Sequence, residues 1–285
     1  MNINVLHIRD SGVPTRSICP KIIMTTGSGM PSTLSAGLRL LETVQYALVD
    51  ELNDLGLPNM AATLDALYRS ERFLKLDHLS HIAELIEPEY QDNVSKRVNN
   101  RLRHAKLTGY PQSLEDCVDS GSREYLPCGI TSVLSSLVFV RDGLNICILD
   151  PSDSGKTHLA KAIGIAACKE HKVEYHHCKS FLEDMVALKN VSYEKYERKL
   201  KLLERLDLLI LDDFLLHTIT DEREVKVLFM ILEKHCEAQK STIVCSQREP
   251  TSWASMILND EVSANAITKR VTKHYTVVIN TKNNK

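Results

Sequence analysis

The sequence has few aromatic residues, no excess charge of either sign and no long apolar run, and each shortage excludes a class of protein. Lys and Arg (35) nearly balance Asp and Glu (37), so any nucleic-acid surface must be a local patch and not an overall field. No apolar run approaches the roughly 18 residues of a membrane-spanning helix. The 43% of apolar residues still allows a globular core. We therefore expect a cytoplasmic protein without a membrane segment.

Paired cysteine motifs are also missing. The eight cysteines include no C-x-x-C pair, and no Cys or His doublet has the spacing of a zinc finger. His176 and His177 are adjacent and would point to opposite faces of a strand. The N-terminus has no basic segment followed by an apolar one, which disfavours a secretory signal. The sequence therefore predicts free thiols in a reducing compartment and no Cys/His metal site.

Composition and apolar periodicity divide the chain into four segments. Residues 1–33 mix Pro, Gly, Ser and Thr without periodicity and predict a poorly ordered leader. Apolar spacings of three and four across residues 34–107 predict a small helical domain, in which Pro88 ends one helix and a basic helix follows to about Leu107. Residues 108–126 are loop-rich and predict a linker. Residues 127–285 predict a second domain, with a different pattern of apolar residues.

In the second domain, short aliphatic runs alternate with helical patterns. The expected strands are 145–149, 173–178, 207–211, 241–245 and 275–279, and the helices between them are 157–170, 179–189, 193–206, 221–238 and a broken 251–273. Buried strands that alternate with helices predict an α/β fold with a five-stranded parallel sheet covered on both faces.

A phosphate-binding loop is predicted between the first expected strand and the helix after it. The motif G-x-x-x-x-G-K-[ST] in this context cradles phosphates, with Lys156 reaching the terminal phosphates and the Thr157 hydroxyl holding Mg²⁺. The predicted ATP-binding residues are Ser152, Asp153, Ser154, Gly155, Lys156, Thr157 and His158.

This loop departs from the motif. Asp150 stands where the first Gly is expected, and Asp153 is a second acid beside the phosphates. Glycine lets the backbone adopt positive φ and lets phosphate approach closely, whereas a carboxylate repels it. We expect weakened nucleotide binding, and whether ATP is hydrolysed stays open.

A second group of acids ends the strand over 207–211. Asp212 would hold Mg²⁺ together with Thr157, and Asp213 would polarise the attacking water, because ligands bind at the carboxyl ends of strands in open α/β sheets. The alternative is that two acids simply end a strand at a turn facing solvent. The upstream lysine motif favours the functional interpretation.

The order and the amino-acid sequences of these segments resemble those of the IstB-like family of AAA+ ATPases, the transposition helper proteins of insertion sequences. The DnaC-type helicase loaders are relatives of this family. The resemblance runs from about Leu57 to Ile279 and is most specific over residues 155–160, 207–213 and 241–247, with Trp253 shortly after. It implies a P-loop AAA+ fold, with a five-stranded parallel sheet preceded by a small all-helical domain. Residues 1–33 have no counterpart in the family.

The resemblance also implies roles for single residues. Ser246 and Gln247 match the polar sensor that orients the lytic water, and Arg270 matches the arginine inserted into a neighbour's nucleotide site. The alternatives are turn contacts for the first two residues and a surface position for Arg270.

A basic patch is expected at the end of the helical domain, where no acid lies between Val94 and Lys106. The candidate DNA-backbone contacts are Lys96, Arg97, Arg101, Arg103 and Lys106. Few aromatic residues interleave with them, so base stacking is not indicated. A solvated helix face is the alternative. Trp253, Phe229 and Met230 lie in helical patterns and predict core packing.

Together these features predict an ATP- and Mg²⁺-dependent helper that assembles as a homo-oligomer on double-stranded DNA and stimulates or targets a transposase. One alternative is a DnaC-like helicase loader, and another is a non-hydrolysing scaffold with a degenerate phosphate loop. A small-molecule kinase fits the paired acids and the polar fourth strand less well.

Overall fold

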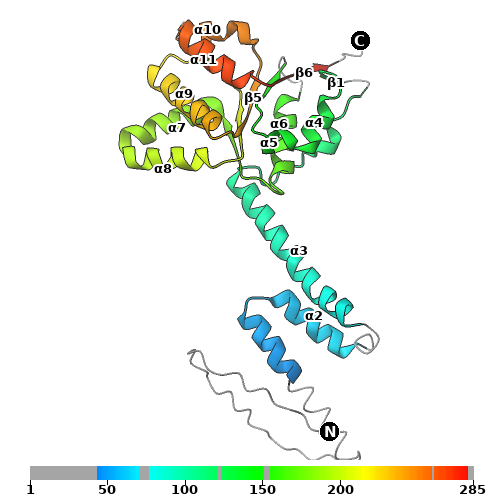
Figure 1. The fold of residues 1–285 in the computed structure, drawn as a ribbon. Helices are drawn as coiled ribbons and strands as arrows, with labels where there is room; N and C mark the ends of the chain where they lie inside the picture. Colours follow the sequence, from blue (N-terminus) through cyan, green and yellow to red (C-terminus); the bar gives the residue numbers. More distant parts are fainter. Residues whose placement is uncertain (1–43, 71–76, 121–122, 151–154, 259, 282–285) are drawn as a thin grey trace, which may run out of the picture. The chain divides into compact units, whose positions relative to one another are not determined.

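The computed structural model describes residues 44–70, 77–120, 123–150, 155–258 and 260–281 (Figure 1). The predicted leader over 1–33 lies outside these ranges. The chain divides into two compact units, residues 1–85 and 86–285. In the first unit, residues 44–54 are helical and precede α2 (Pro58–Arg69). The buried residues of α2 are Ala61, Leu64 and Leu67, at the spacing the sequence predicts.

The basic helix is longer than predicted. A helix ended by Pro88 was expected, and this is wrong: α3 spans His78–His104 with Pro88 inside. Proline removes one backbone donor and crowds the preceding turn, at a cost of about 3 kcal/mol, but the other residues keep their helical bonds. Lys106 adopts φ 61°, and the Leu107 amide donates to the Leu102 carbonyl at 2.9 Å, which closes the helix end.

One mixed sheet organises the second unit. Its strand order is β1-β6-β2-β5-β4-β3. The five predicted strands all form and run parallel, as β2 (Ile146–Leu149), β3 (Val173–His177), β4 (Leu208–Asp212), β5 (Ser241–Ser246) and β6 (Tyr275–Thr281). The expected strand number was one short, because β1 (Arg123–Leu126) pairs antiparallel with β6 inside the segment predicted as a linker. Four residues are too few for periodicity to reveal, and pairing supplies what the local sequence lacks.

Helices cover both faces of the sheet, as predicted. They are α4 (Ile130–Ser136), α5 (Val138–Arg141), α6 (Lys156–Ala167), α7 (Cys178–Val191), α8 (Tyr193–Glu204), α9 (Glu222–Glu237), α10 (Trp253–Met256) and α11 (Glu261–Val271), with 3-10 turns at Leu114–Asp116 and Pro250–Ser252. The break expected within 251–273 falls between α10 and α11. Among the described residues, no helix has the length and apolarity needed to cross a bilayer.

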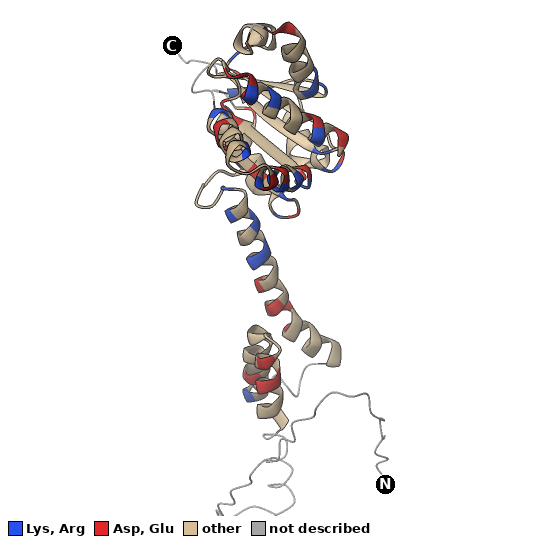
Figure 2. Cartoon of the chain, turned by 90° about the vertical axis from the view of Figure 1, so that its left-hand side faces the viewer, with Lys and Arg blue, Asp and Glu red and all other residues tan. Residues whose placement is uncertain are grey.

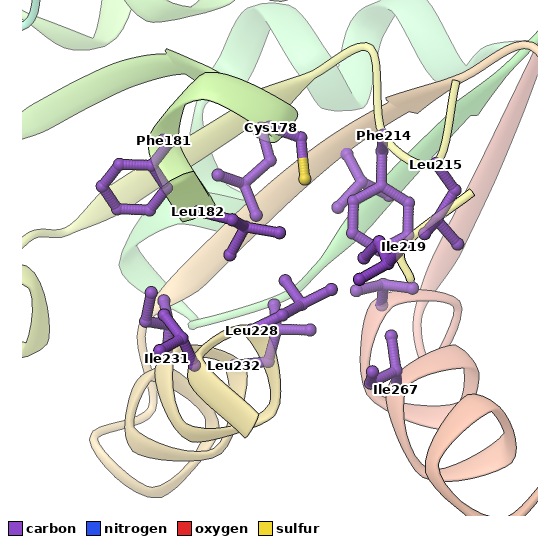
Figure 3. Packing of buried hydrophobic residues seen from close by; sticks show 14 of the residues in the cluster. Cys178, Phe181, Leu182, Phe214, Leu215, Ile219, Leu228, Ile231, Leu232 and Ile267 are labelled. Carbon is purple, nitrogen blue, oxygen red and sulfur yellow. The ribbon is translucent and has the colours of Figure 1, made fainter. Parts of the chain in front are cut away.

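Successive residues of a strand pack into two separate hydrophobic cores, one on each face of the sheet. Cys147 and Leu149 pack with α7, α9 and α11, whereas Ile146 and Ile148 pack with α4 and α6. Figure 3 shows part of the first core, with side chains from α7, α9 and α11 meeting around Phe214 and Ile219. Both faces of the sheet are therefore buried, and the edge formed by its strand ends is left for ligands.

The predicted packing of three large side chains is partly confirmed. Trp253 is fully buried and contacts Phe214 edge to face, with 5.1 Å between the ring centroids. Phe229 packs against the same core. Met230 is 44% exposed, so its assignment to the core was wrong. The buried stripe of α9 passes through Val227, Leu228 and Ile231, which leaves residue 230 on the outer side.

Candidate nucleotide-binding site

The phosphate loop joins the end of β2 to the start of α6. Gly155 caps α6 with φ 100°, in the left-handed region that favours glycine. Gly155 itself offers no side-chain cap to the amides at the start of α6, which lie at the positive end of the helix dipole. Ser152, Asp153 and Ser154 lie outside the described residues, and their expected contacts stay predictions.

Lys156 is buried at the first position of α6, with 7% of its surface exposed. Its Nζ donates to the carbonyl oxygen of Asp150 at 2.7 Å. Burial lowers the pKa of Lys156, and the nearby carboxylates of Asp150, Asp212 and Asp213 oppose that shift. The ammonium group therefore lies within the field of the two acids that the sequence predicts to share its site.

The two residues predicted to hold Mg²⁺ lie in contact. Thr157 Oγ1 donates to Asp212 Oδ2 at 2.7 Å, and Asp212 is only 1% exposed. The Asp213 amide donates to Asp212 Oδ1 at 3.0 Å. Hydroxyl and carboxylate oxygens are the ligands that Mg²⁺ takes, commonly together with waters and phosphate oxygens. These residues therefore fit a magnesium ion bound with a triphosphate.

Asp213 is set apart from Asp212 by its backbone. Its φ of 52° turns the chain sharply at the end of β4, an uncommon conformation for a residue other than glycine. Its side chain is 39% exposed, and Oδ2 lies 3.3 Å from Nδ1 of His177. Asp213 can therefore meet a water or ligand from outside, whereas Asp212 is reached only from within the site.

Strand β3 supplies two neighbours of these acids that the sequence analysis missed. Tyr175 Oη donates to Asp212 Oδ2 at 2.6 Å, and His177 contacts Asp213. Burial, followed by the adjacent Asp212 carboxylate, raises the pKa of Tyr175, so the phenol keeps its proton. A tyrosine at a buried position of β3, whose hydroxyl needs a hydrogen-bond partner there, was the available signal.

A third missed residue is Arg123 on β1. Its guanidinium atoms lie 3.2–3.3 Å from the position that a Cβ on Gly155 would occupy. A side chain at residue 155 would thus meet both an unfavourable φ and the arginine. Because β1 itself was not predicted, nothing in the sequence indicated that Arg123 reaches the loop.

The predicted sensor residues follow β5. Ser246 is fully buried, donates through Oγ to the Phe214 carbonyl at 2.8 Å, and accepts from the Arg248 amide at 3.2 Å. The Ser246 carbonyl accepts the Asp150 amide at 3.3 Å, which links β5 to the start of the phosphate loop. Gln247 is half-buried and comes directly after. Ser246 thus makes the turn contacts of the alternative interpretation, and the sensor role stays a prediction.

His158 and the cysteines complete the neighbourhood of α6. The His158 ring lies with Nδ1 3.7 Å from Cys117 Sγ, and its predicted nucleotide contact is not tested by this geometry. Seven cysteines fall within the described ranges, and all are free thiols. Within those ranges, no three His, Cys, Asp or Glu side chains form a cluster that could hold a metal. The Thr157 and Asp212 pair differs from such clusters because it needs phosphate and water as further ligands.

Arg270 lies on α11, and its guanidinium donates to Glu233 Oε1 and to the Ala266 carbonyl, both at 2.9 Å. It also stacks over the Phe229 ring, 4.5 Å from the centroid. Its backbone carbonyl accepts from the Asn145 side chain at 2.7 Å, next to the start of β2. Lys156 follows the other end of β2. Arg270 therefore lies at the amino ends of the parallel strands, and the phosphate loop of the same chain lies at their carboxyl ends.

The predicted basic patch splits into two groups on α3 and the turn after it (Figure 2). Lys96, Arg97 and Arg103 are exposed and bond to oxygens of Asp92, Asn93 and Asn100 in the same helix. Arg101 instead donates to the carbonyls of Cys168 and Lys169, at 3.4 and 2.6 Å, at the end of α6. Lys106 Nζ lies 3.4 Å from Nδ1 of His176. Arg101 and the exposed Lys106 thus connect the end of the helix to α6 and β3, whereas the other three cations bond within α3.

Comparison with known proteins places these features in a family context. The family model described as IstB-like ATP binding protein matches residues 50–285. The insertion sequence ATP-binding protein y4uH of Sinorhizobium fredii is 31% identical over 80% of this chain and 90% of its own length. The insertion sequence IS21 ATP-binding protein of Pseudomonas aeruginosa is 25% identical over 80% and 83%, respectively. The crystal structure of the DnaC helicase loader covers 60% of this chain and 98% of its own, at 19% identity and a TM-score of 0.46.

Proposed function

The chain belongs to the IstB-like ATP-binding family of insertion sequences, and from this premise we propose that it is an ATP- and Mg²⁺-dependent helper of DNA transposition. In this proposal it binds ATP at the edge of its sheet, self-associates, holds double-stranded DNA with α3 and stimulates or targets a transposase. The names of its relatives place them in insertion sequences, which supports a transposase as the partner class.

One observation carries the nucleotide part of the proposal. The hydrogen bond between Thr157 Oγ1 and Asp212 Oδ2, 2.7 Å long, brings together two residues from separate motifs, beside the buried Lys156. A hydroxyl, a carboxylate and a lysine at a helix N-terminus are what a magnesium-triphosphate needs. A chance turn of two acids would not place Asp212 against the helix that follows the phosphate loop.

The buried and the exposed side chains of the candidate site would have different roles. Lys156 and the first amides of α6 would bind the terminal phosphates, while Thr157 and Asp212 would hold Mg²⁺. Bound Mg²⁺ would neutralise charge that develops on the transferred phosphoryl group. Asp213, more exposed and beside His177, would orient the attacking water and accept hydrogen bonds from it.

Self-association would complete this site from a second copy. Arg270 lies at the opposite edge of the sheet from its own phosphate loop and so cannot serve that loop without rearrangement. A head-to-tail contact between copies would bring one edge against the other, and such contacts repeat into rings or filaments. Within its own chain, Arg270 is paired with the Glu233 carboxylate. Assembly would therefore replace this carboxylate with the phosphates bound by the neighbouring copy.

The exposed cations of α3 support the DNA part of the proposal. Lys96, Arg97 and Arg103 lie within about two turns of one helix, with no acid between Val94 and Lys106. Such a face binds phosphate without reading sequence, and counterion release makes its affinity fall steeply with salt.

The proposal is tested by nucleotide-dependent assembly and DNA binding of the full chain. We expect ATP with Mg²⁺ to shift the protein to a larger species in analytical ultracentrifugation and to raise its affinity for duplex DNA. Binding to duplex should weaken steeply between about 50 and 200 mM salt. A chain that neither assembles with ATP nor binds duplex in a salt-sensitive manner would contradict the proposal.

A second candidate, a scaffold that binds nucleotide without hydrolysing it, is favoured by Asp150. Among the residues that the structure describes, Oδ2 of Asp150 has no hydrogen-bond partner; this buried oxygen lies at the start of the loop, where the motif has glycine. A carboxylate there opposes the phosphates. Steady release of phosphate from ATP that stops when Asp213 is changed to Asn would exclude the scaffold, whereas tight binding without turnover would favour it.

A helicase loader is the other candidate from the same fold. It would prefer single-stranded DNA and a hexameric helicase. Capture of either a transposase or a replicative helicase by the ATP-bound chain, with single- and double-stranded DNA compared in parallel, separates the two functions.

A further inference from the structure

The carboxylate of Asp212 is held by more donors than the two sequence motifs provide. Oδ2 accepts from Thr157 Oγ1 at 2.7 Å and from Tyr175 Oη at 2.6 Å, and Oδ1 accepts from the Asp213 amide at 3.0 Å. A carboxylate has about four lone-pair directions. Three are taken by these donors, and the buried Cys245 thiol adds a further hydrogen bond to the same carboxylate.

The phenol has a fixed position because both its backbone and its ring are held. Tyr175 is 4% exposed, and its amide donates to the Ala105 carbonyl at 3.1 Å. In the register of β3 on β4, His177 pairs with Asp212 and Tyr175 pairs with Ile210. Tyr175 thus lies two residues before His177, on the same face of the sheet. Lys161 Nζ lies 5.2 Å from the ring centroid, between this ring and that of Tyr110.

We propose that Tyr175 is a positioning residue of the candidate metal site: its phenol fixes the orientation in which the Asp212 carboxylate would serve Mg²⁺. This rests on the proposed function, since it assumes that Asp212 serves Mg²⁺ bound with ATP. Without the phenol, Oδ2 loses its shortest hydrogen bond, and because Asp212 is 1% exposed, bulk water is not at hand to replace it. The carboxylate could then rotate, and the coupling between Mg²⁺ and nucleotide would weaken.

The test compares ATP affinity with and without Mg²⁺ for the full chain and for Tyr175→Phe. Phenylalanine keeps the ring and removes only the hydroxyl. In excess EDTA we expect the two proteins to bind ATP within about twofold, since the phosphate contacts are untouched. With Mg²⁺, we expect Tyr175→Phe to bind roughly tenfold more weakly and to need roughly tenfold more Mg²⁺ for half-saturation, the effect of losing one hydrogen bond to a charged group.

Tyr196→Phe is the matched control, because Tyr196 is also buried but lies on α8 in the other core. It should leave the Mg²⁺ dependence unchanged. A double-mutant cycle with Asp212→Asn adds a readout that a packing role would not move: in that background, Tyr175→Phe should no longer change the Mg²⁺ dependence. Equal weakening with EDTA and with Mg²⁺, or an undiminished effect in the Asn background, would overturn the inference.

Site-specific 3-fluorotyrosine at position 175 keeps the hydroxyl and serves if Tyr175→Phe does not fold. Its ¹⁹F resonance should shift when Mg²⁺ is added to the ATP-bound protein, and a resonance that is insensitive to Mg²⁺ would overturn the inference. Failure of the unaltered chain to bind ATP at all would overturn the proposed function and this inference with it. ATP binding with normal Mg²⁺ coupling in Tyr175→Phe would overturn the inference alone.

Discussion

The phosphate-loop edge of the sheet and the helix α3 differ in what holds their charged residues. At the sheet edge, Lys156 and Asp212 are buried and bonded to other elements of the fold. On α3, Glu89 is the one buried residue, and the exposed cations Lys96 and Arg97 bond to Asp92 and Asn93 of the same helix. Buried charges are costly unless paired, so the first arrangement is specific, whereas the second is adaptable. Changes at the sheet edge should therefore have large, local effects, and changes on α3 small, additive ones.

The largest effect is expected from Lys156→Ala, which removes the one buried cation at the start of α6. ATP affinity should fall about 100-fold or more, roughly 3 kcal/mol, since a charge-assisted contact to phosphate is lost. Isothermal titration calorimetry measures the change. Lys179→Ala, on α7 and paired with Glu224, is the matched control and should bind ATP as the unaltered chain does. Retained affinity in Lys156→Ala would mean that nucleotide binds elsewhere.

The next effect concerns the junction between the two regions, where Lys106 meets the β3 cluster of Glu174 and His176. Burial alone would raise the pKa of Glu174, but hydrogen bonds from His176 and Lys199 lower it from 4.5 to about 2. A depressed carboxyl pKa stabilises the fold above pH 4.5, and that stability is lost as the pH falls from 4.5 toward 2. The loss should be on the order of 2–3 kcal/mol.

Urea unfolding at pH 7, 4 and 3 measures this contribution. Glu174→Gln should be less stable than the unaltered chain at pH 7, with a difference that shrinks as the pH falls. Glu183→Gln, whose side chain is 56% exposed, should show neither effect. A constant difference at all three pH values would show that the Glu174 charge is not what stabilises the junction.

A gain is expected from Asp150→Gly. The carbonyl that holds Lys156 remains, while a buried, unpartnered carboxylate oxygen and its repulsion of phosphate are removed. ATP affinity should rise about tenfold, or roughly 1.4 kcal/mol. Calorimetry with ATP and Mg²⁺ measures the gain. Asp142→Asn removes a charge that is paired with Arg141 instead, and it should have no effect. Unchanged affinity in Asp150→Gly would refute the cost assigned to this aspartate.

The smallest effect is expected on α3. Arg97→Ala should weaken duplex DNA binding a few-fold and lower the slope of log affinity against log salt by about 0.9, the effect of one lost phosphate contact. Arg198→Ala, an exposed arginine on α8, should change neither quantity. Fluorescence anisotropy at several salt concentrations measures both. An affinity drop without a change of slope would indicate a structural role for Arg97.

The sequence predicted the sheet unit closely because its signals are local. Five apolar runs separated by helical patterns identified the parallel strands, and two short motifs predicted that Thr157 and Asp212 lie together, as their 2.7 Å hydrogen bond shows. These features depend on periodicity and on glycine and lysine chemistry at adjacent positions. The family resemblance agreed with the same segments and is shown by the match over residues 50–285.

Long-range pairing was not predictable. Strand β1 exists because Tyr125 pairs with Ile279, more than 150 residues away, and Arg123 reaches Gly155 only through that pairing. Tyr175 meets Asp212 through the register of β3 on β4, which no local pattern specifies. Pro88 was given too much weight, because a local cost was taken as decisive in a helix with many other bonds.

The bond from Lys156 to the carbonyl of Asp150 has a bearing on how the protein behaves between rounds of ligand binding. The ammonium has three donors, and the loop's own carbonyl accepts one of them, which fixes the direction of the side chain before a phosphate meets it. Less side-chain freedom is then lost when a phosphate binds, and the measured affinity should include that saving.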